Sequence, residues 1–154
     1  MEINPRIDGL EVYGLNVFKI QGASPALTLY FRTMTLKRAK QLEDEGNWDC
    51  TNKVEKKYIE VFDIAPKLEK EDIKVQIDGV DVEVYHLNRI LEYVGLDEAF
   101  NKPQYMPAYM IQVALGEDYN SKRYEYKKIN VEVVDSETNE KGEASVFWKE
   151  EISI

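Results

Sequence analysis

Cysteine and histidine are nearly absent from this sequence, and their scarcity excludes several classes of site. Cys50 is the single cysteine and His86 the single histidine among 154 residues. One thiol cannot form an internal disulfide, and one thiol with one imidazole cannot supply the four ligands of a structural zinc site. The sequence therefore predicts neither a bound metal nor a cofactor. Neither residue has a catalytic partner at a recognisable spacing.

Long apolar runs and short catalytic motifs are missing as well. The apolar runs extend over a few residues only, whereas a membrane-spanning helix requires roughly 18. The first six residues lack the basic and apolar regions of a signal peptide. No Gly-rich phosphate loop, nucleophile elbow, HExxH element or EF-hand loop occurs. These absences predict a cytoplasmic protein, or part of a particle assembled inside the cell, with no membrane partner and a non-enzymatic role.

The residues that are present suffice for one folded domain. The chain is 44% hydrophobic, and its length predicts a single domain spanning residues 1–154. The net charge of −9 makes duplex DNA an unfavourable partner. Most of the excess negative charge lies in residues 41–100, which hold 16 acidic and 7 basic residues. This segment is therefore a candidate for covering a basic surface on a partner.

Alternating apolar side chains predict a structure made mainly of antiparallel strands. The predicted strands are 10–20 with a bulge or turn at Gly14, 27–33, 58–64, 109–115, and a long hairpin with arms 124–134 and 144–152 and a bulge near Lys127–Lys128. The loop 47–56, with Trp48 and Cys50, is predicted to be polar and irregular.

The clearest local pattern is a hairpin over residues 73–85. Asp78-Gly79 is a preferred two-residue type I′ turn, and apolar residues alternate outward from it on both sides. The turn predicts three facing pairs: Ile77 with Val80, Val75 with Val82, and Ile73 with Val84. On the other face, Lys74 is predicted to lie opposite Glu83.

Two segments have helical spacing. Residues Thr35–Glu45 place Leu36, Ala39 and Leu42 on one face, with Thr35 as the expected N-cap. The apolar residues of 87–94 recur at i, i+3, i+4 and i+7, with Gly95 as the stop. A charged connector over 66–72 adds one helical turn. The predicted fold class is α+β: mainly antiparallel sheet, arranged as a partly closed barrel or a sandwich, with two or three short helices.

The predicted helix over 35–45 contains the first candidate binding site. Lys37 and Arg38 lie near its N-terminus and acidic residues near its C-terminus, which is unfavourable for the helix macrodipole. Unpaired N–H groups beside Thr35 and two cations favour a phosphate or carboxylate ligand. The alternative is a solvated surface with a Lys40–Asp44 pair.

The second candidate site rests on tyrosine, of which the chain has ten. Arg123, Tyr124, Tyr126 and Lys127 place aromatic rings next to cations on a predicted strand. Such surfaces stack and attract single-stranded nucleic acid. Tyrosine is also enriched at protein interfaces, so the same residues fit a protein partner.

Three functions remain open at this point. The first is a non-enzymatic protein–protein interaction or structural subunit of a larger assembly, with a protein partner or further copies of itself. The second is a binding module for single-stranded nucleic acid or a phosphorylated small molecule. Its candidate residues are Thr35, Lys37, Arg38, Arg123, Tyr124, Tyr126 and Lys127. The third is an acidic inhibitor that covers a basic partner surface.

Overall fold

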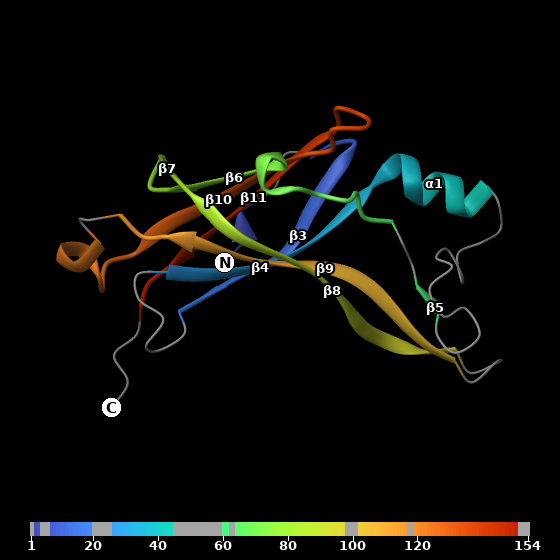
Figure 1. Ribbon diagram of the computed structural model, residues 1–154, viewed down its shortest axis with the longest axis horizontal. Coiled ribbons are helices and arrows are strands. Elements are labelled where there is room, and N and C mark those ends of the chain that lie inside the picture. The colour runs from blue at the N-terminus through green and yellow to red at the C-terminus, as the bar shows by residue number, and fades with distance from the viewer. Residues whose placement is uncertain are drawn as a thin grey trace.

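A computed structural model describes residues 2–3, 7–19, 26–44, 60–61, 64–97, 102–116 and 119–150. Two antiparallel sheets face each other in a sandwich-like arrangement, each built around four strands (Figure 1). The first sheet has the order β11-β10-β6-β7, and the two-residue strands β1 and β2 also pair with β11. Its strands are β1 (Glu2–Ile3), β2 (Ile7–Asp8), β6 (Ile73–Ile77), β7 (Val80–Val82), β10 (Lys127–Val134) and β11 (Lys141–Trp148).

The second sheet has the order β3-β4-β9, with β8 pairing along β9. Its strands are β3 (Leu10–Phe18), β4 (Ala26–Thr35), β8 (Val84–Asp97) and β9 (Lys102–Ala114), with the short parallel strand β5 (Glu60–Val61) on β9. The described part of the chain also contains one α-helix and two 3₁₀ helices: α1 (Leu36–Asp44), η1 (Lys70–Asp72) and η2 (Tyr119–Lys122). None of these helices is long and apolar enough to cross a membrane.

The core lies between the sheets and is filled by alternate residues of each strand, as the period of two requires. The inward side chains of β4, β9 and β10 are buried. Tyr109 stacks on Phe31 with ring centroids 5.7 Å apart. Its hydroxyl donates to the Pro66 carbonyl at 2.5 Å and accepts from the Leu68 amide at 3.0 Å. This buried phenol therefore has hydrogen-bond partners, as a phenol in a core requires.

The chain passes from one sheet to the other at two corners. Gly9, with φ +84°, separates β2 of the first sheet from β3 of the second. Glu83 separates β7 from β8 in the same way. The two sheets also approach each other where β11 packs closely on β3. A Cβ on Gly142 would lie only 2.3 Å from the Leu10 carbonyl oxygen. The two sheets are thus tied together by the covalent chain as well as by the core.

The predicted hairpin at Asp78-Gly79 is confirmed for its first two pairs. Ile77 faces Val80 and Val75 faces Val82, with positive φ at both turn residues. The third pair is wrong, because the chain leaves the first sheet at Glu83 and Val84 pairs with Val113 of the second.

The charge pair predicted for the other face of that hairpin, Lys74 opposite Glu83, is wrong for the same reason. Lys74 lies opposite Glu132 of β10, and its ammonium is 3.9 Å from the Asp81 carboxylate rather than beside Glu83.

The predicted helix over 87–94 is wrong: these residues lie within β8. The helical spacing of Leu87, Ile90, Leu91 and Val94 also fits a strand that has apolar residues on both faces. These residues form a strand rather than a helix because β9, which is thirteen residues long, pairs with β8 along its length. The antiparallel sandwich is therefore confirmed, while the helical share is smaller than predicted.

The strands of the C-terminal hairpin start and end elsewhere than predicted. β10 begins at Lys127 and its register with β11 is continuous, so the bulge predicted near Lys127–Lys128 is wrong. The change in apolar phase arises because residues 123–126 lie in a turn after η2. By contrast, the predicted irregularity at Gly14, the strand at 27–33 and the helical turn within 66–72 are confirmed. The loop 47–56 lies outside the described residues.

Gly142→Ala is expected to destabilise the fold by about 1–3 kcal/mol, because the new methyl group would collide with backbone of β3. Urea denaturation measures the change. Gly95→Ala is the matched control, since its Cβ would meet only the Gln104 side chain at 3.6 Å. Equal stability of the two variants would contradict the close packing of β3 on β11.

Candidate protein-interaction surface

The first predicted anion site is occupied by groups of the protein itself. Thr35 is the N-cap of α1, since its Oγ1 accepts from the Arg38 amide at 3.2 Å. The Arg38 guanidinium binds the Asp135 carboxylate at 2.6 Å and the Glu137 carboxylate at 2.9 Å. Both acids belong to the turn between β10 and β11. Lys37 is exposed on the helix surface.

Asp135 is the buried partner in the ion pair with Arg38. Its carboxylate is nearly buried, and burial alone would raise its pKa, but hydrogen bonds from Arg38 and the Glu137 amide lower the pKa below the ordinary value. The ion pair therefore links α1, which follows the second sheet, to the outer turn of the first sheet. This arrangement leaves Arg38 engaged rather than presented to an external anion.

The second predicted site is also rearranged. Lys127 is buried, and its ammonium donates to the carbonyls of Lys122 at 2.6 Å and Glu125 at 3.0 Å. Arg123 forms two hydrogen bonds with Glu150, at 2.9 and 2.7 Å. Both cations therefore stabilise the fold locally.

Tyr124 and Tyr126 are exposed, as a binding role requires, but they lie in the turn before β10 rather than on a strand. A cation accompanies each ring: Arg123 lies over Tyr124 and Lys149 over Tyr126. The two predicted sites do not meet, because α1 and η2 lie at opposite ends of the longest axis (Figure 1).

The remaining candidate residues provide no reactive cluster. His86 is exposed on β8. In the ranges that the structure describes, no group of three or more His, Cys, Asp or Glu side chains could hold a metal ion. Cys50 lies outside those ranges.

The longest hairpin extends beyond its own sheet. β4 pairs with β9 only between Ala26–Ala114 and Phe31–Tyr109, whereas β8 and β9 remain paired out to Asp97 and Lys102. We call residues 91–97 of β8 and 102–107 of β9 the arm. Figure 1 shows the arm running away from the sandwich toward one end of the molecule. β5 pairs with it over two residues only.

The arm exposes large apolar side chains. Tyr93 is 61% exposed and Leu96 47%, and Leu91 and Val94 are exposed as well. Tyr93 packs edge-on against Tyr105, with ring centroids 6.0 Å apart. Exposed apolar side chains grouped on one element mark an interaction surface. A two-stranded hairpin in water is also only marginally stable by itself.

The arm is anchored where it leaves the sheet. Glu92 accepts a hydrogen bond from the Tyr30 hydroxyl and lies 3.5 Å from the Arg32 guanidinium, both on β4. Arg32 in turn donates to the Tyr30 oxygen at 2.8 Å. Burial, together with the hydrogen bond to Glu92, raises the pKa of Tyr30 above its ordinary value. The arm therefore projects from a fixed base.

The outer edge of β8 is only partly protected against pairing, by register shifts against β9 between Val84 and His86 and between Tyr93 and Gly95. Within the described strands, β8 pairs only with β9. Residues 84–97 contain neither lysine nor proline, the residues that commonly block an exposed edge. Sequence reasoning missed this surface because it assigned Leu87–Val94 to one buried helix face. The signal that could have found it is the absence of alternation between apolar and polar residues.

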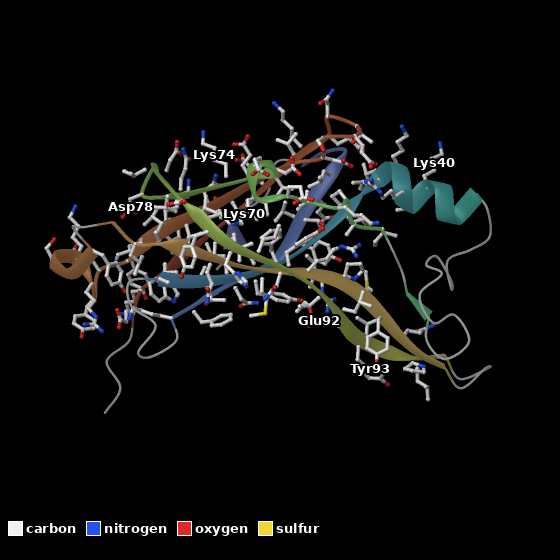
Figure 2. The ribbon with its side chains drawn as sticks, in the orientation of Figure 1. Lys40, Lys70, Lys74, Asp78, Glu92 and Tyr93 are labelled. Carbon is white, nitrogen blue, oxygen red and sulfur yellow. The ribbon has the colours of Figure 1, made fainter. Side chains whose placement is uncertain are left out.

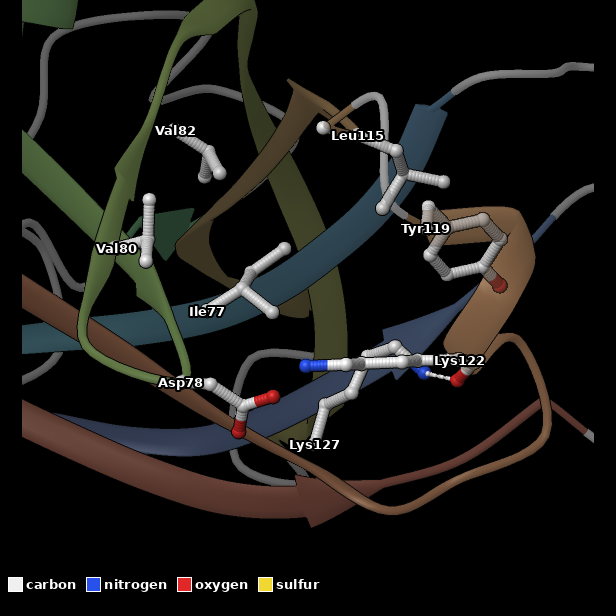
Figure 3. A pocket seen from close by; sticks show the side chains of 9 residues that line it. Ile77, Asp78, Val80, Val82, Leu115, Tyr119, Lys122 and Lys127 are labelled. Carbon is white, nitrogen blue, oxygen red and sulfur yellow. Dashed lines mark hydrogen bonds between the residues drawn. The ribbon is translucent and has the colours of Figure 1, made fainter.

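A pocket lies at the other end of the molecule, beside β7 (Figure 3). Its volume is 230 Å³, and its lining is Ile77, Asp78, Val80, Val82, Leu115, Gly116, Tyr119, Lys122 and Lys127. Figure 3 shows Lys122 extending across the opening toward Asp78. The lining therefore combines apolar side chains with the buried Lys127, and Asp78 and Lys122 carry charges at the rim.

The comparisons with known proteins give no relative. No family model matches the chain, and neither the curated proteins nor the solved structures match it significantly.

Glu150→Gln is expected to lower stability in a pH-dependent way. Hydrogen bonds from Arg123, aided by one from Tyr119 and opposed by burial, lower the pKa of Glu150 from 4.5 to about 2. A lowered carboxyl pKa stabilises the native state fully above the ordinary value, and this contribution is lost as pH falls through the native one. The difference between wild type and variant should therefore be largest at neutral pH and shrink between 4.5 and about 2.

Urea denaturation at successive pH values measures that difference, with Glu125→Gln as control at an exposed carboxyl of the same end. A difference that stays constant down to the lowest pH would contradict the Arg123–Glu150 pairing.

Proposed function

We propose that this protein is a non-enzymatic subunit of a larger assembly, which binds its neighbour through the β8–β9 arm. The observation that carries the proposal is the combination of exposed apolar side chains with an open strand edge on the same segment. Strand addition supplies backbone hydrogen bonds, and the exposed side chains supply apolar burial. Tyr93 is the expected centre of the contact, because tyrosine is enriched among residues that dominate binding energy.

The anchoring of the arm supports this role. A partner that binds a preorganised element loses less conformational entropy than one that must order a mobile loop. Glu92, held by Tyr30 and Arg32, fixes the base of the arm on β4. The free energy gained from contacts with a partner therefore contributes to affinity, because little of it is needed to order the arm.

Single-stranded nucleic acid is the second candidate partner. It is favoured by Tyr126 and Phe147, which are 67% and 51% exposed, and by Lys149, whose ammonium lies 4.8 Å from the Tyr126 ring centroid. Rings and cations in this order suit base stacking and phosphate attraction. This candidate ranks second because Arg123 and Lys127 are engaged within the protein and the net charge is −9.

A photoreactive benzoylphenylalanine in place of Leu96 is expected to crosslink a protein chain, because Leu96 is exposed on the arm. The crosslinking is done in an extract of the source cells with the full chain, and mass spectrometry identifies the captured residues. The same group in place of Lys74, exposed on the first sheet, is the control. The proposal fails if position 96 captures nothing beyond what position 74 captures.

A further inference from the structure

We draw no further inference here: the strongest candidate, the 230 Å³ pocket beside β7 at the opposite end of the longest axis from Tyr93 (Figure 2), has exposed charges of both signs at its rim, Asp78 and Lys122, and a buried Lys127 ammonium that donates to the Lys122 and Glu125 carbonyls, so nothing in the structure shows which ligand or partner would occupy it.

Discussion

The length of β9 relative to β4 is the constraint on which the account depends. β4 and β8 both pair with β9 only from Tyr109 to Val113. Over this part its inward side chains are buried. Beyond the last β4 pair, Phe31 with Tyr109, β9 and β8 stay paired out to Lys102 and Asp97, and among the described strands only the two-residue β5 joins them there. The exposed side chains of the arm follow from that difference in strand length.

The cations that the sequence offers for anion binding mostly stabilise the sandwich. Arg38 meets Asp135 and Glu137, and these carboxylates bring negative charge to the N-terminus of α1. This pairing resolves the unfavourable charge order of the helix, because acid from another part of the chain complements its macrodipole. At the other end, Glu150 ties the last described residues to Arg123 and η2. Each end of the sandwich is thus closed by an ion pair between distant segments.

Local features of the fold were predictable, whereas long-range pairings were not. The Asp78-Gly79 turn and the Thr35 cap depend on residues within a few positions, and both are confirmed. Arg38 finds Asp135 at a separation of 97 residues, which no local pattern encodes. Residues Leu87–Val94 have a spacing that fits a helix and a two-faced strand equally, and only the partner strand β9 distinguishes them. The arm was missed for that reason.

Amide hydrogen exchange over residues 91–97 tests the central claim most directly, because an open edge leaves half of a strand's amides without partners. In the isolated monomer, the amides of β8 that face away from β9 should exchange rapidly while those of β4 are protected. In the assembled protein, the same amides of β8 should become protected and those of β4 should not change. Equal exchange of the β8 amides in both states would contradict the claim that the arm is the surface covered on assembly.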